Sequence, residues 1–365
     1  MKIIGPIAGI GSRLRPFTLS KPKAFINVAG KTVLDHILTK FLNTFDSNTE
    51  LILIVGYKKR QIIDYVKKHY SDKFQLTFIE QIPRGFQDNV PFYWGLGEAV
   101  YLAHKRFKNV EIRNPEDDKR EGCLIFLGDM ILLDEYSYLM YRYYESDVDG
   151  IITVMKVPKQ DASSYGIVDV DEDGIIKKLI EKPKSYISNL AIAGIYAFSY
   201  HASQSLFNHL KNKLETRKKE NKEIYLTESL QDLVDEGYKI AAVELKKGIL
   251  DFGKPVSLLK GNKYLLEQQS YDIEYFQNRD VKIEKSLVKN PSYIGKNTQI
   301  VNSIIGPFAS IGKNCNIKNS IIENCVIEKN TQLTNIITEN SIIGSNVCID
   351  SISKKNLIIG DKCVY

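Results

Sequence analysis

The sequence predicts an α/β protein in which a doubly wound, mostly parallel sheet domain is followed by a β-helix of hexapeptide-like repeats. Three observations indicate this fold class. Near-continuous apolar runs alternate with helical periodicity up to about residue 262. From residue 290 onward, aliphatic residues recur at about every sixth position. The chain of 365 residues also exceeds the usual size of a single domain.

Five apolar runs predict strands in the first domain, at residues 2–7, 51–55, 76–79, 123–127 and 150–154. Between the first two runs, residues 31–45 carry one apolar helix face, formed by Val33, Leu34, Ile37, Leu38 and Phe41. Apolar strands separated by helices indicate a parallel sheet covered on both faces. Ligands of such sheets bind beyond the carboxyl ends of the strands.

The C-terminal repeat has a period that neither a helix nor an alternating strand possesses. In a β-helix, each short face contributes one inward aliphatic, and the turns take Gly, Asn, Ser and Asp. The predicted inward residues are Ile294, Ile300, Ile305, Ile311, Ile317, Ile322, Ile327, Leu333, Ile337, Ile343 and Ile349. An ordinary β-sandwich is the alternative. We therefore predict a sheet domain at 1–262, a connector at 263–289 that begins with a helix, and a β-helix at 290–365.

The composition indicates which kinds of molecule the protein binds. The net charge of +6 is spread along the chain, which favours small phosphorylated ligands over nucleic acid. No apolar stretch approaches the ~20 residues of a membrane span, and the N-terminal apolar run is too short for a signal peptide. We therefore expect a cytoplasmic protein without membrane contact. The cysteines show no CxxC spacing, and we expect the four in the repeat, Cys315, Cys325, Cys348 and Cys363, to be buried free thiols.

The strongest chemical signal is the run IAGIGSRLRPFTLSKPKAF at residues 7–25, directly after the first strand. Gly9 and Gly11 allow a tight loop whose backbone N–H groups approach phosphate oxygens. Arg13 and Arg15 add guanidinium groups suited to a triphosphate. The run is neither a Walker loop nor a G-x-G-x-x-G dinucleotide fingerprint.

This run resembles the signature GxG[ST]RLxPxT…PK of the sugar nucleotidylyltransferases, which include glucose-1-phosphate thymidylyltransferases and uridylyltransferases. Similar elements follow in the family's order: GLGEAV (95–100), FLGDMIL (126–132), SYGIVDVDEDGIIKKLIEKP (164–183), LAIAGIYAF (190–198), YLTES (225–229) and LDFGKP (250–255). Long members of the family end in a left-handed β-helix. The resemblance implies an enzyme that joins a nucleoside monophosphate to a sugar phosphate and releases pyrophosphate.

The resemblance also implies a magnesium site and a set of catalytic residues. An in-line attack between two anionic substrates depends on positioning and charge neutralisation. Asp129, just past an apolar strand, and Asp251 are the implied Mg²⁺ ligands. Arg13 would stabilise the β- and γ-phosphates, and Lys23 would neutralise charge around the α-phosphorus. Asp129, Arg13 and Lys23 are therefore the expected catalytic residues.

The resemblance also implies two groups of substrate-binding residues. The expected nucleotide-binding residues are Ala8, Gly9, Gly11, Ser12, Arg13, Gln81 and Gly95. Those expected to bind the sugar phosphate are Tyr165, Gly166, Glu181, Lys182 and Gly194. In the family, a glutamine reads the Watson–Crick edge of the base through its amide.

Two segments interrupt the family pattern. Residues 82–94 form an aromatic and proline-rich insertion between Gln81 and Gly95, so Gln87 is a rival assignment for the base-reading glutamine. Its aromatic rings either stack near the base or pack against the catalytic domain or a neighbouring subunit, and the sequence favours packing slightly. Residues 111–122 are charged and predict a solvated loop. Met130 stands where thymidylyltransferases often carry Asn.

The predicted substrates are a pyrimidine triphosphate, dTTP or UTP, and glucose 1-phosphate. Three alternatives remain: GTP with mannose 1-phosphate, a non-catalytic regulatory or assembly relative, and a bifunctional enzyme whose β-helix also transfers an acyl group. Such acyltransferases usually use a histidine base in the repeat, and residues 210–365 contain no histidine. The five histidines are predicted to be structural or exposed. We expect the β-helix to mediate homo-oligomer formation.

Overall fold

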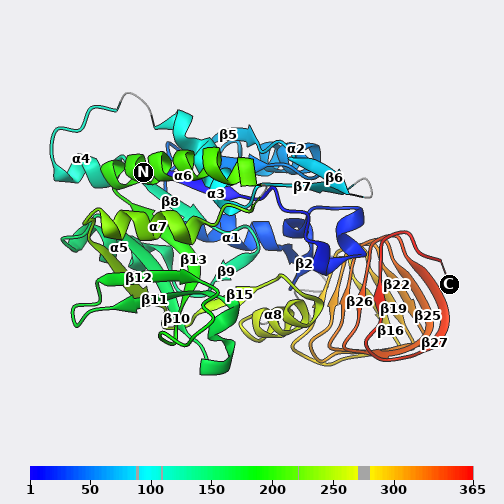
Figure 1. Cartoon of the computed structure of the whole chain (residues 1–365). Coiled ribbons are helices and arrows are strands. Elements are labelled where there is room, and N and C mark those ends of the chain that lie inside the picture. Colours follow the sequence, from blue (N-terminus) through cyan, green and yellow to red (C-terminus); the bar gives the residue numbers. More distant parts are fainter. Residues whose placement is uncertain (88–89, 108–109, 221, 270–279, 365) are drawn as a thin grey trace. The chain divides into compact units, whose positions relative to one another are not determined.

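A computed structural model describes residues 1–87, 90–107, 110–220, 222–269 and 280–364 (Figure 1). The chain divides into two compact units. The first, which we call the sheet unit, comprises Met1–Ile10 and Ile37–Ile249. The second, the β-helix unit, comprises Gly11–His36 and Leu250–Tyr365. The segment that follows the first strand thus clusters with the repeat. The boundaries predicted at 262 and 289 stay a prediction.

A nine-stranded mixed sheet organises the sheet unit, with the order β12-β11-β13-β8-β1-β4-β5, while β10 pairs with β13 and β14. Four strands are mutually parallel: β1 (Lys2–Pro6), β4 (Glu50–Val55), β5 (Gln75–Glu80) and β8 (Cys123–Phe126). The others are β10 (Gly150–Lys156), β11 (Gly166–Val170), β12 (Ile176–Glu181), β13 (Leu190–Phe198) and β14 (Ile240–Glu244). All five strands predicted from apolar runs are confirmed, within one or two residues at their ends.

Helices cover both faces of this sheet, as a doubly wound fold requires. On one face, α3 (Leu96–Leu102), α6 (Tyr200–Glu220) and α7 (Leu226–Asp235) share a buried core with Ile4, Ile125 and Phe198. On the other, Phe41 of α1 (Val33–Phe41) packs against Phe126 of β8 at 5.0 Å between ring centroids. Two more helices are α2 (Lys59–Tyr70) and α5 (Tyr136–Glu145), and the short strand β9 spans Met130–Leu132.

The charged segment 111–122 contains a short helix, α4 (Pro115–Arg120), so the predicted loop is wrong there. Asn114 caps this helix by accepting a hydrogen bond from the backbone N–H of Asp117 at 2.9 Å. Proline occupies the first helical position, acidic residues the first turn and basic residues the last, which is the order that helix termini favour. None of its residues is buried, so the expected solvation is confirmed.

The repeat forms three faces of parallel strands stacked coil on coil. One face holds β16 (Lys282–Glu284), β19 (Gln299–Val301), β22 (Asn316–Lys318), β25 (Gln332–Glu339) and β27 (Cys348–Ser353). The second holds β17 (Leu287–Val288), β20 (Ile304–Ile305), β23 (Ile321–Glu323) and the end of β25. The third holds β18 (Tyr293–Ile294), β21 (Ser310–Ile311), β24 (Val326–Ile327), β26 (Ile342–Ile343) and β28 (Ile358–Ile359). The predicted left-handed β-helix is confirmed, and its parallel strands begin at Lys282, inside the predicted connector.

The β-helix unit also contains α8 (Pro255–Glu267), β2 (Asn27–Val28) and β3 (Lys31–Thr32). The helix predicted to open the connector at residues 263–276 corresponds to the last turn of α8, and its remainder from residue 270 lies outside the described residues. The chain passes from one unit to the other within β15 (Ile249–Asp251).

All predicted inward aliphatics of the repeat are buried except Ile337, whose side chain is 52% exposed. The inward position there belongs to Thr338, which pairs with Ile322 of the preceding coil and is 3% exposed. Its hydroxyl lies 2.7 Å from that of Ser341 and donates to the Lys354 carbonyl at 2.8 Å. Because these bonds satisfy the hydroxyl, a polar residue is tolerated where the aliphatic pattern predicts Ile.

Asparagines form the corners of the coils. Asn297, Asn314, Asn330 and Asn346 each adopt a positive φ, which asparagine tolerates better than most residues. Their side-chain amides bond to one another in a ladder, at 3.3, 3.0 and 3.1 Å. The turn residues of the sequence therefore fix both the corner conformation and the stacking.

The cysteines are all free, but the prediction that the four in the repeat are buried is correct only for Cys315 and Cys325. Cys348 is exposed because it precedes the inward Ile349 on the same strand, and adjacent strand residues face opposite sides. Cys363 is half-buried.

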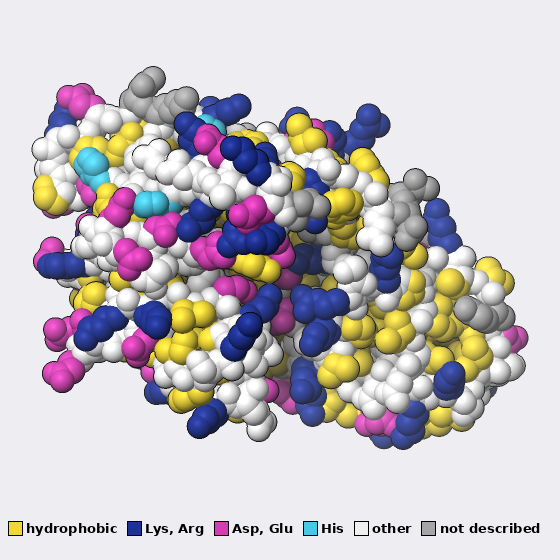
Figure 2. All heavy atoms as spheres, in the orientation of Figure 1, with side chains coloured by type: hydrophobic (Ala, Val, Ile, Leu, Met, Phe, Trp, Pro, Cys, Tyr) yellow, Lys and Arg dark blue, Asp and Glu magenta, His cyan; other side chains and the backbone are white. Residues whose placement is uncertain are grey.

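The surface carries both signs of charge. Figure 2 shows basic and acidic side chains interspersed on the face in view, in keeping with a net charge of only +6. Among the described helices, none has the length and apolar character needed to cross a membrane.

Candidate functional site

The parallel strands of the sheet unit bring three predicted site residues to one edge. β1, β4, β5 and β8 run in the same direction, so the residues that follow them share the carboxyl edge of the sheet. Ala8 follows β1, Gln81 follows β5 and Asp129 follows β8. The Ala8 carbonyl accepts a hydrogen bond from Tyr57 N–H at 3.2 Å, and Asp129 is half-buried. Gly9 is exposed beside Ala8.

Gln81 is held by its surroundings in one orientation. It is 3% exposed, and its amide nitrogen donates to the Gly95 carbonyl at 3.1 Å and to the Glu98 carboxylate at 2.9 Å. Both partners are acceptors, which fixes which end of the amide carries nitrogen. Glu98 is 7% exposed in the first turn of α3, and Lys218 lies 3.5 Å from its other oxygen. Both amide hydrogens of Gln81 are therefore used inside the protein, and within the described residues no group donates to its carbonyl oxygen, which can accept from a ligand.

The insertion that follows Gln81 forms a hairpin of β6 (Gly85–Gln87) and β7 (Val90–Phe92). The Arg84 guanidinium lies 4.6 Å from the ring centre of Phe92 and 4.9 Å from that of Trp94. The Lys218 ammonium lies 5.8 Å from Trp94, which also packs against the main core. Trp94 thus packs within the protein, as the favoured alternative predicts, whereas Phe86 of the same insertion is 67% exposed. Gln87 is exposed on the hairpin.

Tyr93 is the ring of the insertion that reaches the carboxyl edge. A Cβ added at Gly56, just past β4, would lie 2.9 Å from both the Tyr93 hydroxyl and the Ala8 Cβ. Burial raises the pKa of Tyr93 to about 12.

The predicted sugar-phosphate residues gather at the β11–β12 hairpin. Gly166 pairs with Glu181 across the two strands, and the Tyr165 carbonyl accepts from Lys182 N–H at 3.0 Å. The Glu181 carboxylate accepts from the Thr227 hydroxyl at 2.8 Å. A Cβ at Gly166 would stand 3.2 Å from that carboxylate, so glycine keeps the approach open.

Lys182 and Gly194 complete this group with unusual backbone conformations. Lys182 has a φ of 46°, and its ammonium lies 3.4 Å from Glu181 and 5.6 Å from the centre of the Tyr225 ring. Gly194 of β13 has a φ of 79°, and a Cβ there would meet the Met130 sulfur at 2.8 Å. Both its backbone conformation and the close neighbour favour glycine at this position.

The remaining predicted residues lie in the β-helix unit. Gly11 has a φ of 67°, and a Cβ there would stand 2.9 Å from the Cβ of Lys23. Asp251 accepts a hydrogen bond from Gly253 N–H at 2.7 Å. A Cβ at Gly253 would lie 3.2 Å from the Arg13 guanidinium and 2.9 Å from Asp251. The loop and the Asp251 turn are thus in contact, and Ser12 is exposed.

Asp129 and Asp251, the two predicted metal ligands, carry the kind of group that binds magnesium. The described residues contain no cluster of three His, Cys, Asp or Glu side chains that would hold a metal without help from substrate. Mg²⁺ commonly takes one or two carboxylates together with water and substrate phosphates. Asp129 of the sheet unit and Asp251 of the β-helix unit each carry a half-buried carboxylate, the kind of group that Mg²⁺ takes.

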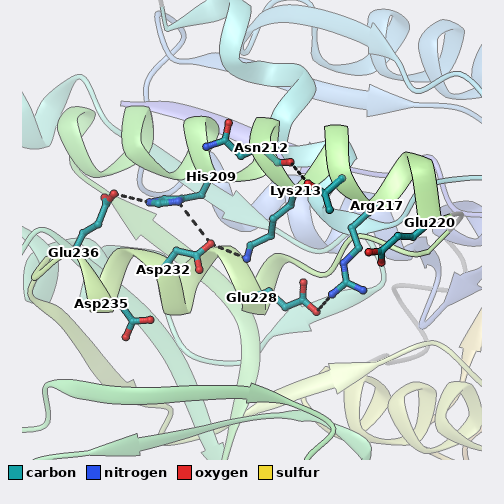
Figure 3. Close-up of a pocket in the computed structure, with 10 residues that line it drawn as sticks. His209, Asn212, Lys213, Arg217, Glu220, Glu228, Asp232, Asp235 and Glu236 are labelled. Atoms are coloured by element: carbon teal, nitrogen blue, oxygen red, sulfur yellow. Dashed lines mark hydrogen bonds and ion pairs between the residues drawn. The ribbon is translucent and has the colours of Figure 1, made fainter.

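A groove of about 720 Å³ between α6 and α7 contains none of the predicted site residues (Figure 3). Its cations face carboxylates: Lys213 lies 2.8 Å from Asp232, and Arg217 lies 2.6 Å from Glu228. His209 lies 3.0 Å from Glu236, in keeping with the structural role expected of the histidines. The ion pairs that line this groove therefore join α6 to α7.

Sequence reasoning missed Glu98, Thr227 and Tyr93. Glu98 lies in the GLGEAV element and Thr227 in the YLTES element, but neither motif by itself indicates a role for these side chains. Tyr93 is one of several aromatic residues in the insertion, and the sequence does not distinguish it from the others. Their contacts with Gln81, Glu181 and Gly56 depend on residues distant in sequence.

A glycine loop after the first strand, with carboxylate and amide side chains beyond parallel strands, defines the class of α/β nucleotide-binding proteins. Within that class, residues 7–268 match the family described as "Nucleotidyl transferase", and the chain belongs to this family. Residues 277–337 match the family "GlmU-like, C-terminal hexapeptide".

Similar proteins carry related names. A "Bifunctional protein GlmU" of Methanocaldococcus jannaschii is 32% identical over 268 residues, covering 73% of this chain and 55% of that protein. "UTP--glucose-1-phosphate uridylyltransferase AglF" of Haloferax volcanii is 29% identical over 280 residues, covering 75% of this chain and all of that protein. The chain thus spans little more than half the length of the GlmU relatives.

Solved structures agree in fold. A UDP-glucose pyrophosphorylase complexed with UDP-glucose superposes with a TM-score of 0.57 at 20% identity, over 73% of this chain and 99% of that chain. A second, from Acinetobacter baumanii, gives 0.56 at 20% identity, over 76% and 97%.

Proposed function

We propose that this protein is a sugar-1-phosphate nucleotidylyltransferase that converts UTP or dTTP and glucose 1-phosphate to an NDP-sugar and pyrophosphate. The observation that carries the proposal is the family match over residues 7–268, and the presence of Arg13, Lys23, Asp129 and Asp251 in the sequence supports it. The relative named as a uridylyltransferase, matched over its whole length, supports UTP and glucose 1-phosphate.

The hydrogen bonding of Gln81 favours a nucleotide whose base carries a ring N–H. With both amide hydrogens engaged by Gly95 and Glu98, Gln81 offers a carbonyl oxygen to the ligand. Uracil and thymine present N3–H to such an acceptor, whereas cytosine and adenine present a ring nitrogen lone pair. Guanine also carries a ring N–H, so GTP with mannose 1-phosphate is the second candidate.

The signature loop would hold the triphosphate. Backbone N–H groups of Ala8, Gly9, Gly11 and Ser12 would approach its oxygens, since glycine lets the backbone come close. The Arg13 guanidinium would stabilise charge that develops on the leaving pyrophosphate. Lys23 would reduce repulsion between the α-phosphate and the attacking sugar phosphate.

The β11–β12 hairpin would hold the sugar phosphate. Lys182 would pair with the phosphate, and Glu181, oriented by Thr227, would accept hydrogen bonds from sugar hydroxyls. Tyr165, Gly166 and Gly194 would leave room for the sugar ring. Asp129 and Asp251 would hold Mg²⁺, which neutralises phosphate charge when bound.

One screen tests this function. Purified protein is incubated with each of five nucleoside triphosphates crossed with several sugar 1-phosphates, and pyrophosphate release is measured. We expect the highest kcat/KM for UTP or dTTP with glucose 1-phosphate. Release only with GTP would support the second candidate. Nucleotide binding without release in any combination would support the regulatory alternative.

Three related expectations stay predictions. Acetyl transfer from acetyl-CoA to an amino sugar should be absent, because residues 210–365 contain no histidine base. The protein should form a homo-oligomer through its β-helix, which sedimentation of the full chain would measure. A cytoplasmic location would follow from the same function.

A further inference from the structure

The segment that carries Arg13 and Lys23 packs on the β-helix. Residues 11–36 belong to the same compact unit as the repeat. A Cβ at Gly360, in the last coil, would lie 2.9 Å from Pro16, and one at Gly30 would lie 2.3 Å from the Tyr293 ring. Contacts at both ends of the segment are therefore tight.

A polar cluster, formed by Ser20, Lys21, Glu328, Ser345 and Asp361, joins the middle of the segment to the coils. Lys21 pairs with Glu328 and lies 3.2 Å from Asp361. The Ser20 hydroxyl donates to Asp361 at 2.5 Å, and Ser345 donates to Glu328 at 2.7 Å. The segment is thus bonded to the coils of β24 and β28, and Lys21 also reaches Ser345 on the coil between them, at 3.4 Å.

Glu328 also fixes the backbone of the segment. Its second carboxylate oxygen accepts from Asn27 N–H at 3.3 Å, and the residue is only 2% exposed. A buried carboxylate is costly unless it is paired and hydrogen-bonded, so the folded state strongly favours the geometry that keeps these partners in place. Lys23 lies between Lys21 and Asn27, the two residues that Glu328 holds.

Asn262 of α8 provides a second attachment nearby. It is fully buried, accepts from Ala29 N–H at 2.9 Å and from the Ser310 hydroxyl at 2.7 Å, and donates to the Phe308 carbonyl at 3.2 Å. One side chain therefore links Ala29 of the segment to the coil of β21.

We propose that Glu328 and Asp361 are positioning residues, through which the β-helix holds residues 20–27 in the conformation that Lys23 needs for catalysis. The inference rests on the proposed function, and it gives the β-helix a part in nucleotidyl transfer beyond assembly. Neither residue is among those expected to bind substrate. Their effect passes through Lys21, Ser20 and Asn27 to the neighbouring Lys23.

The test compares Glu328→Gln with Glu339→Gln in the full chain. Glu339 carries a similar ion pair, with Lys355, on the exposed surface of the same β-helix, so it is a matched control. We expect Glu328→Gln to lower kcat about 10- to 100-fold, the scale for a small misplacement of a catalytic group, with the nucleotide KM nearly unchanged. Glu339→Gln should leave both constants at the wild-type value.

Thermal unfolding of each variant separates positioning from folding. If Glu328→Gln lowers Tm while kcat per folded molecule, measured well below that Tm, equals wild type, the role is structural and the proposal is overturned. Asp361→Asn, at the end of the chain, provides a milder variant should Glu328→Gln fail to fold. It should lower kcat in the same way, and wild-type kcat would overturn the proposal.

Hydrogen exchange distinguishes this inference from the proposed function. Amides of residues 20–27 should exchange about tenfold faster in Glu328→Gln than in Glu339→Gln, the factor expected when one charged hydrogen bond is lost. Unchanged exchange would overturn the attachment even in an active enzyme. If the wild-type protein releases no pyrophosphate with any substrate pair, the proposed function fails, whereas faster exchange would still establish the attachment.

Discussion

The orientation of Gln81 predicts that its carbonyl oxygen selects the base, and substitution of this one side chain can test that. Gln81→Met keeps the length of the side chain and removes the carbonyl acceptor. Gln87→Met is the matched control, because Gln87 is the rival glutamine and is exposed on the β6–β7 hairpin. We expect wild type and Gln87→Met to prefer UTP strongly over CTP, and Gln81→Met to lose most of that preference.

The size of the effect follows from the burial of Gln81, which is 3% exposed. UTP would donate N3–H to the Gln81 oxygen, whereas CTP would place a lone pair against it. A buried acceptor left without a donor costs about 1–3 kcal/mol, which is about a 5- to 150-fold ratio in kcat/KM. Methionine accepts only weakly, so this ratio should fall close to one in Gln81→Met.

The assay is pyrophosphate release at saturating glucose 1-phosphate, with kcat/KM measured for UTP and CTP in all three proteins. N3-methyl-UTP, which lacks the ring N–H, should behave like CTP in wild type. If Gln81→Met discriminates as well as wild type and Gln87→Met does not, Gln87 reads the base. If both variants discriminate like wild type, neither glutamine reads it, and the argument from the Glu98 and Gly95 contacts is refuted.

Three other predictions concern the metal, the repeat and the insertion. Asp129→Asn and Asp251→Asn should each lower turnover at least ~10²-fold without changing Tm, and near-wild-type turnover at limiting Mg²⁺ would exclude that residue as a ligand. Thr338→Ala should lower the free energy of unfolding in urea by ~1–3 kcal/mol, whereas Ile337→Ser should stay within ~0.5 kcal/mol. An equal loss of unfolding free energy in the two variants would contradict the assignment of Thr338, rather than Ile337, to the inward position. Saturating UTP should leave Trp94 emission unshifted, because two protein cations lie over its ring, and a shift would indicate that the insertion borders the nucleotide.

Much of the fold was predictable because it depends on local periodicity. The strands of the sheet are continuous apolar runs, and the coils repeat an aliphatic residue that must face inward. The errors arise where local pattern is ambiguous. Residues 115–120 are polar and exposed, so only the cap and terminal charges indicate a helix. At Thr338, a satisfied hydroxyl replaces the expected aliphatic.

The candidate site was predictable to a different extent. Ala8, Gln81 and Asp129 share the carboxyl edge of the sheet because the strands that precede them run parallel, and the apolar runs of the sequence predict a parallel sheet. The partners of these residues were not predictable. Glu98 orients Gln81, and Thr227 orients Glu181, through contacts between side chains on different elements.

The sequence by itself determined the two architectures, the family resemblance and the residue types available for phosphate, metal and base. Only the tertiary structure decided which hydrogen-bonding groups remain for a ligand, as at Gln81. It also decided that residues 11–36, which carry Arg13 and Lys23, pack on the β-helix. The bond between Lys21 and Glu328 joins residues 307 positions apart. No periodicity or motif encodes such a pair, because its geometry exists only after the coils have stacked and buried the carboxylate.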